Sequence, residues 1–197
     1  MKRKICFVLC MAVLFAVCLF SVSSFAGECR NIRREVLRLH VVADSDSETD
    51  QKLKLLVRDE VLKKGGELFY GSVTADEAER VIIPRTDELK AAAENVLRQN
   101  GCDNSVEITV GEEYFATRCY ENFTMPAGVY TAVRVNIGSA QGQNWWCVMF
   151  PPLCLPAASA DADAFFTEGE MKVISSSPEY EPRFKIVEII EKIKSKL

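Results

Sequence analysis

His40 is the only histidine of the chain, and it decides which nucleophilic chemistry the sequence could perform. A cysteine or serine nucleophile needs a neighbouring base to take its proton, and here that base would have to be His40. Its apolar neighbours indicate a strand, which favours a structural or partner-contacting histidine. Cys147 follows two tryptophans and has Cys154 nearby, rather than a helix start or a cation that would favour a thiolate. A hydrolase using Cys147 and His40, acting on the cell wall, remains the alternative function.

Acidic residues alternate after position 43 in a way that only partly resembles a calcium loop: Asp44, Asp46, Glu48 and Asp50. The glycine of the sharp turn and the closing glutamate of a calcium loop are absent. Ser47, followed three residues later by a carboxylate, is instead typical of a helix start. Zinc would need a Cys-x-x-Cys pair or a second histidine, and phosphate a Gly-Lys-Ser/Thr run. The sequence therefore predicts no metal, no cofactor and no catalytic set.

A block of eleven residues from Asn144 to Cys154 contains both tryptophans of the chain, two prolines and two cysteines. Adjacent residues of a strand face opposite ways, so Trp145 and Trp146 cannot both enter the same core. If one indole lies near solvent, it is a candidate binding hot spot, because tryptophan offers a large contact area at low entropic cost. If the strand is covered on both faces, both indoles are internal. The sequence leaves both possibilities open.

The N-terminus has the organisation of an export signal. Lys2, Arg3 and Lys4 precede an uncharged apolar run that begins at Ile5. Small residues at Ser24 and Ala26 predict cleavage between Ala26 and Gly27. The alternative is an uncleaved anchor, because the run reaches the roughly 20 residues that span a bilayer. The predicted segments are a signal or anchor at 1–26, a flexible tail at 27–34 and a single domain at 35–197.

Charge argues against a nucleic-acid partner. The formal net charge is −4, and removal of the N-terminal segment would take three cations with it. The remaining basic residues alternate with acids instead of forming the basic patch that grips phosphate backbones.

Cysteine usage agrees with export. Three cysteines lie in the N-terminal segment and five follow it: Cys6, Cys10 and Cys18, then Cys29, Cys102, Cys119, Cys147 and Cys154. Five is odd, so one thiol stays unpaired. A bridge from Cys147 to Cys154 would contribute about 2.5 kcal/mol in the chain-entropy model. A second bridge from Cys102 to Cys119 requires a suitable hairpin register, and the alternative is that several cysteines are small buried hydrophobes.

Hydrophobic periodicity predicts an α+β protein with a mainly antiparallel sheet of about five strands and helices on one face. The expected strands are 35–42, a hairpin of 106–110 with 114–120 turning at 111–113, 128–137 and 145–150. The expected helices run from Ser47 to Gly65, from Thr74 to Asn100 with a division at Pro84, and around 184–193 at the C-terminus.

Several ordered blocks resemble the stage II sporulation protein R family: Arg38 to Ser47, Asp50-Gln51, Leu53-Lys54, Val57-Arg58-Asp59, Phe115 to Arg118 with Tyr120, Pro126 to Tyr130, and Asn144 to Cys154. The resemblance covers nearly all of the chain after position 26. Three features depart from the family pattern: Asp44 replaces the usual asparagine, Ala116 replaces proline, and the spacing from Gly138 to Asn144 is longer. These departures concern local turns.

The resemblance implies a non-enzymatic signalling protein exported from the forespore into the space between the two septal membranes. It would activate a membrane-bound aspartic protease, which then processes a mother-cell sigma factor precursor. Membrane contact would come only through an uncleaved N-terminal segment. From the matched blocks and from residue chemistry, the candidate partner-binding residues are Trp145, Trp146, Asn144, His40, Asp46 and Arg58.

Overall fold

The computed structural model describes residues 2–120, 123–153, 165–175 and 182–196. The chain forms two compact units. The larger consists of residues 33–114 and 129–167, and the smaller combines residues 1–32, 115–128 and 168–197. Residues 35–197, for which the sequence predicts a single domain, contribute to both units.

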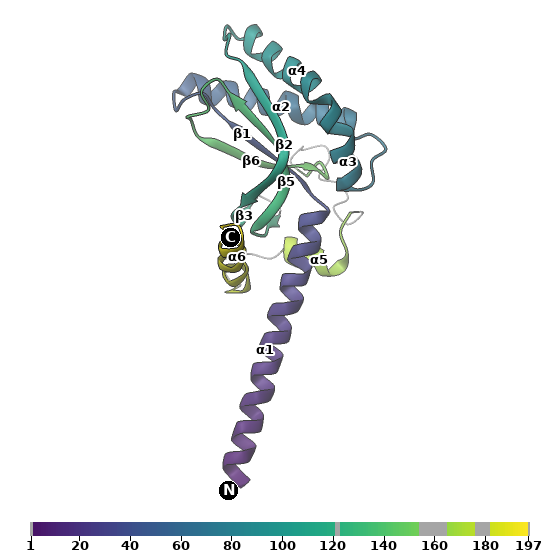
Figure 1. Cartoon of the computed structure of the whole chain (residues 1–197), viewed down its shortest axis with the longest axis vertical. Helices are drawn as coiled ribbons and strands as arrows, with labels where there is room; N and C mark the ends of the chain where they lie inside the picture. Colours follow the sequence, from purple (N-terminus) through teal and green to yellow (C-terminus); the bar gives the residue numbers. More distant parts are fainter. Residues whose placement is uncertain (1, 121–122, 154–164, 176–181, 197) are drawn as a thin grey trace. The chain divides into compact units, whose positions relative to one another are not determined.

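A four-stranded sheet organises the larger unit (Figure 1). Its spatial order is β2 (Val106–Phe115), β5 (Gly128–Ile137), β1 (Leu37–Val42) and β6 (Asn144–Phe150). β1 pairs in parallel with β5 and antiparallel with β6, so the sheet is mixed. The predicted α+β class is confirmed, with a parallel pair at the centre of the sheet.

Helices pack on one face of this sheet. They are α2 (Glu48–Leu68), α3 (Ala75–Ile82) and α4 (Thr86–Gln99), with the short 3-10 helix η1 (Ile83–Arg85) containing Pro84. The predicted caps are present: Ser47 Oγ accepts from the Asp50 amide at 3.1 Å, and Thr74 Oγ1 accepts from the Glu77 amide at 3.2 Å. Alternate strand residues meet the apolar faces of the helices in one core: Leu37, Leu39, Val41, Val133, Val135, Ile137, Leu53, Val57, Val61, Leu89, Ala93 and Leu97.

The predicted hairpin at 106–120 is wrong. β2 continues through residues 111–113 as one strand, because Gly111 does not adopt the positive φ that a tight turn would use. The following β3 (Arg118–Cys119) pairs instead with β4 (Thr124–Met125) in a separate two-stranded sheet. Without the hairpin, nothing sets Cys102 opposite Cys119. Both are free thiols, so the second predicted bridge is not formed.

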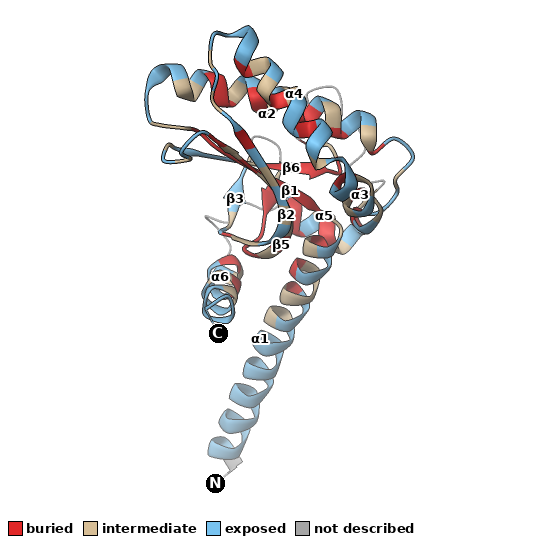
Figure 2. Ribbon diagram, turned by 45° about the horizontal axis from the view of Figure 1, so that its top comes forward, coloured by how far each residue is buried: buried red, intermediate tan, exposed pale blue. Residues whose placement is uncertain are grey.

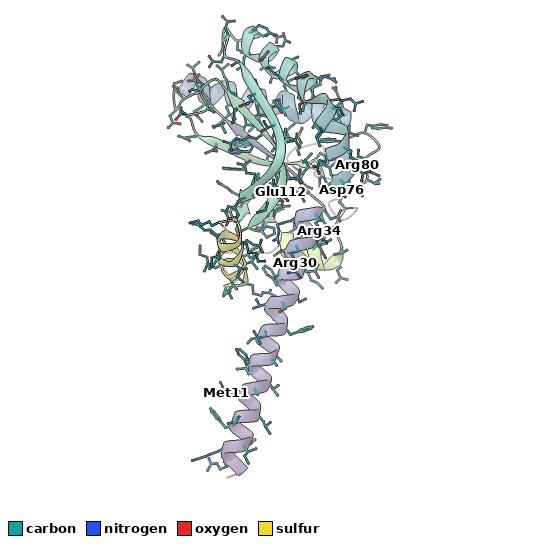
Figure 3. The ribbon with its side chains drawn as sticks, viewed as in Figure 1. Met11, Arg30, Arg34, Asp76, Arg80 and Glu112 are labelled. Carbon is teal, nitrogen blue, oxygen red and sulfur yellow. The ribbon has the colours of Figure 1, made fainter. Side chains whose placement is uncertain are left out.

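The smaller unit contains all but the last two residues of α1 (Lys2–Arg34), together with α5 (Glu168–Ile174) and α6 (Pro182–Lys194). Within the described residues, α1 is the one helix long and apolar enough to cross a membrane, with a mean hydropathy of 3.0 over its most apolar 18-residue stretch. Figure 2 shows its N-terminal part exposed, and Met11, labelled in Figure 3, lies there. Residues 27–34, predicted as a flexible tail, continue the helix, and Cys29 and Ile32 are fully buried.

Candidate functional site

The sheet face opposite the helices carries an aromatic and charged group that we call the polar sheet cluster: His40, Glu113, Arg134, Asn144 and Trp146. The register of β1 with β6 places His40 directly opposite Trp146. Their rings stack with centroids 3.7 Å apart and planes inclined by 15°. The cluster thus draws on all four strands of the sheet.

Both ring nitrogens of His40 are engaged. Nδ1 lies 2.8 Å from Glu113 Oε1, and Nε2 lies 2.6 Å from Asn144 Oδ1. A carboxylate can only accept, so Nδ1 carries a hydrogen. Nε2 can donate a hydrogen to the side-chain oxygen of Asn144, in which case the ring carries two hydrogens and is charged. If the Asn144 amide is rotated by 180°, Nε2 accepts from its NH2 group and the ring is neutral. The ring is 2% exposed and has no nitrogen available to act as a base toward an outside substrate.

Glu113 joins the histidine to a second cation. Its Oε1 also accepts from Arg134 Nη1 at 3.0 Å, and Arg134 Nε donates to Asn136 Oδ1 at 3.0 Å. Such charge-assisted bonds are stronger than neutral ones, particularly where water is excluded. The carboxylate therefore ties β2 to both β1 and β5.

Trp145 lies on the helix-bearing side of β6, because neighbouring strand residues alternate. The Arg58 guanidinium of α2 lies 4.4 Å from the centre of its indole ring, and Asp59 holds Arg58 at 2.7 Å. Trp145 is 37% exposed, and β6 is an edge strand. Of the two possibilities left by the sequence, the structure supports an indole near solvent, and that indole is Trp145.

Asp46 belongs to a third group, which we call the loop clasp: Asp44, Asp46, Lys54, Ser139 and Gln143. These residues tie the turn after β1 to the turn between β5 and β6. The Gln143 amide donates to Asp46 Oδ1 at 2.8 Å, and the Ser139 amide donates to Asp44 Oδ1 at 2.6 Å. The Ser139 amide and hydroxyl lower the pKa of Asp44 below its ordinary 3.8.

Lys54 closes the loop clasp from α2. Its Nζ donates to the Gln143 carbonyl at 3.0 Å and to the Gln51 side chain. Burial lowers the pKa of Lys54, while the negative charge of Asp46 raises it. The lysine thus fixes the start of β6, where Asn144 and Trp145 lie.

The alternative catalytic pair is not assembled. Cys147 pairs with Leu39 and belongs to the helix-side core, whereas His40 stacks on Trp146 on the other face. Cys154 lies outside the described residues, so its bridge to Cys147 stays a prediction. Within the described ranges, no three His, Cys, Asp or Glu side chains are grouped to hold a metal ion.

The six candidate residues thus fall into three groups instead of one site. His40, Asn144 and Trp146 come together, Arg58 stacks on Trp145, and Asp46 lies in the loop clasp. Sequence reasoning missed Glu113, which it assigned to a turn, and Arg134. A usable signal for Arg134 was its position between Val133 and Val135 in a strand whose other side is apolar.

The fold defines an α+β protein whose N-terminal helix is compatible with an export signal or an anchor. The family described as Stage II sporulation protein R (spore_II_R) matches residues 33–160. The chain belongs to this family, which gives it a role in sporulation.

A similar protein is the Stage II sporulation protein R of Bacillus subtilis (strain 168), which is 38% identical over 120 residues. The match covers 61% of this chain and 54% of the relative, so it spans about half of the relative's length. No solved structure matches the chain. The polar sheet cluster, the Arg58–Trp145 pair and the loop clasp all lie within the family match, whereas α6 lies beyond it.

Proposed function

We propose that this protein is an exported sporulation signal that activates a membrane-bound aspartic protease. The protease then processes the precursor of a mother-cell sigma factor. The observation that carries the proposal is the family match over residues 33–160. The apolar helix α1 supports delivery across the forespore membrane into the septal intermembrane space.

The proposed mechanism is recognition rather than bond chemistry. An activator shifts its target only through higher affinity for the active state, here an active and dimeric arrangement of the protease. Trp145 and Arg58 offer the best contact, because the indole is exposed at an edge strand and is already ordered by the guanidinium. Pre-ordered aromatic and arginine side chains are typical of binding hot spots.

The decisive test is reconstitution of precursor cleavage in a non-sporulating host that makes the protease and the sigma factor precursor. Cleavage should require this chain. Trp145→Ala should lower cleavage by about tenfold or more, the effect of losing one hot spot. Tyr70→Ala is the matched control, because Tyr70 is also an exposed aromatic residue, at 95%, and should leave cleavage unchanged.

The variant Trp146→Ala distinguishes the role of Trp146 from that of Trp145. The Trp146 indole supports His40, so its loss should act through the stability and order of the polar sheet cluster. If both tryptophan variants fold, are exported and support normal cleavage, the aromatic contact surface is refuted. If cleavage proceeds without the chain, the activating function itself is refuted.

A further inference from the structure

The outer face of α6 carries four exposed isoleucines, which we call the isoleucine stripe: Ile186, Ile189, Ile190 and Ile193. Their exposed fractions lie between 40% and 57%. At about 100° per residue they span an arc of about 100° on the helix surface. Phe184, which is buried, falls on the opposite side, and the buried Val187 lies between Phe184 and the stripe. The helix therefore packs on its own unit with one face and presents a separate apolar face outward.

Cations border the isoleucine stripe on both sides. By the same angular spacing, Lys185 and Lys192 lie along one border, and Arg183 and Lys194 lie along the other. Lys185 and Lys194 are well exposed, and their partners Glu188 and Glu191 lie toward the buried side. Basic residues outnumber acidic ones across 182–197. An apolar stripe with lysine and arginine borders is the arrangement of a helix that lies in a membrane interface.

The position of α6 within its unit places the stripe near a membrane. Phe25 lies close to the end of the uncharged run of α1, which stops before Glu28, and its ring packs edge-on against Phe184, with centroids 4.9 Å apart. The Arg183 guanidinium lies 4.7 Å from the same ring. The first turn of α6 is thus fixed to α1 where the bilayer-length segment ends. Figure 2 shows the outer parts of both helices exposed.

We propose that α6 is an interfacial helix that lays its isoleucine stripe on an anionic lipid surface at the point where α1 enters the bilayer. The stripe supplies apolar contact at the depth of the headgroups, and the bordering cations select anionic lipid. This assigns a membrane contact to the C-terminal helix, separate from the protease-contacting surface and outside the family match. The full chain, with α1 retained, is the form that makes both contacts.

The test uses the full chain made by cell-free translation, so that α1 is intact, and reconstituted into vesicles with or without brominated acyl chains. The variant Ile190→Trp adds a third tryptophan within the stripe. In vesicles that contain phosphatidylglycerol, brominated lipid should quench a larger fraction of the tryptophan fluorescence of this variant than of the parent chain. Quenching should be weaker in pure phosphatidylcholine. Equal quenching in both lipids overturns the assignment to an anionic surface.

Two double substitutions in the Ile190→Trp background test whether the quenching depends on the apolar character of the isoleucine stripe. Ile189→Glu with Ile193→Glu should abolish the added quenching, whereas Ile189→Leu with Ile193→Leu should retain it. Because all four isoleucines are exposed, helix content in detergent should match the parent. No added quenching from a folded helix overturns the proposal in favour of a protein partner or a second copy.

Deuterium uptake of α6 in the unsubstituted chain provides an independent check. Uptake should be slower in anionic than in zwitterionic vesicles, and identical uptake counts against the proposal. The protease takes no part in these measurements, so they fail or succeed independently of the proposed function.

Discussion

At the scale of single residues, Glu113 has the largest structural role in the polar sheet cluster. One of its oxygens accepts from His40 at 2.8 Å and from Arg134 at 3.0 Å. Its side chain is only 21% exposed, so water replaces these bonds poorly. Removing one partner from a buried charged group leaves the others uncompensated.

Glu113→Gln should lower the free energy of unfolding by about 1–3 kcal/mol. Glutamine carries no negative charge to stabilise the hydrogen bonds from His40 and Arg134, and its NH2 group can only donate. Urea unfolding followed by tryptophan fluorescence measures this change in stability, since Trp146 stacks on His40 in the same cluster. Glu112→Gln is the matched control. Glu112, labelled in Figure 3, is the exposed neighbour and should change stability by less than about 0.5 kcal/mol. Equal effects of the two variants would contradict this role of Glu113.

Asp44 gives the loop clasp a pH dependence. Its pKa in the folded chain is lowered by the Ser139 backbone and hydroxyl bonds, so its contribution is present above the unfolded value of 3.8. That contribution is lost as the pH falls through the lowered folded value. Asp44→Asn keeps an acceptor for the Ser139 amide but does not titrate. The stability difference between the parent and this variant should therefore shrink in acid, and a difference that grows as the pH falls would refute the assignment.

At the scale of elements, two turns determine where β6 begins. The Gly142 amide donates to the Ala43 carbonyl at 2.9 Å, and a Cβ at Gly142 would overlap the carbonyl oxygen of Ser45. A Cβ at Gly138, which has a φ of 55°, would overlap the Asp44 carboxylate. Only glycine permits this close approach of the two turns.

Gly142→Ala should destabilise the protein by about 1–3 kcal/mol, because backbone must move to admit the methyl group. Gly111→Ala is the control, since nothing lies within 4 Å of the position that its methyl group would take, and its strand conformation suits alanine. It should be neutral or stabilising by about 0.5 kcal/mol. The measurement is the melting temperature of each variant by thermal unfolding, and Gly142→Ala should melt at the lower temperature. Indistinguishable melting temperatures would mean that the two turns can separate at little cost in free energy.

Local signals in the sequence predicted much of the local structure, although α2 continues through Gly65, where the sequence predicts its end, to Leu68. The caps at Ser47 and Thr74, the division at Pro84 and the alternation of 128–137 all correspond to observed elements. The parallel pairing of β1 with β5 was not predictable, because alternation identifies a buried face but carries no information on strand direction. The hairpin failed for the related reason that Gly111 suits a strand as well as a turn.

The candidate site shows the same limit. His40, Asn144 and Trp146 could be chosen from their chemistry, but the partners of His40 lie 73 and 104 residues away in sequence. Only the sheet order brings β2 close enough for Glu113 to reach the histidine. The choice of residues was thus possible from sequence, whereas their division into three groups was not.

At the scale of the whole molecule, the fate of α1 decides whether the protein is tethered. The helix continues through the Ala26–Gly27 bond without interruption, and Phe25 is 4% exposed. A peptidase needs an extended and accessible substrate, so we expect a chain that folds before it is cut to retain α1, in contrast to the cleavage between Ala26 and Gly27 that the sequence predicts. Intact mass of the membrane fraction from producing cells should correspond to the full chain. A mass beginning at Gly27 would show that cleavage precedes folding and would remove the Phe25 contact from α6.

The central position of β1 has a consequence for synthesis and delivery. This strand is among the first parts of the larger unit to emerge, yet its two neighbours, Gly128–Ile137 and Asn144–Phe150, are among the last. Sheets built from such distant pairings form slowly, because a long loop must close before any bond is gained. If the chain is exported as we propose, the sheet cannot be completed until residue 150 has crossed the membrane, so no folded sheet forms inside the export channel while the chain is passing through it.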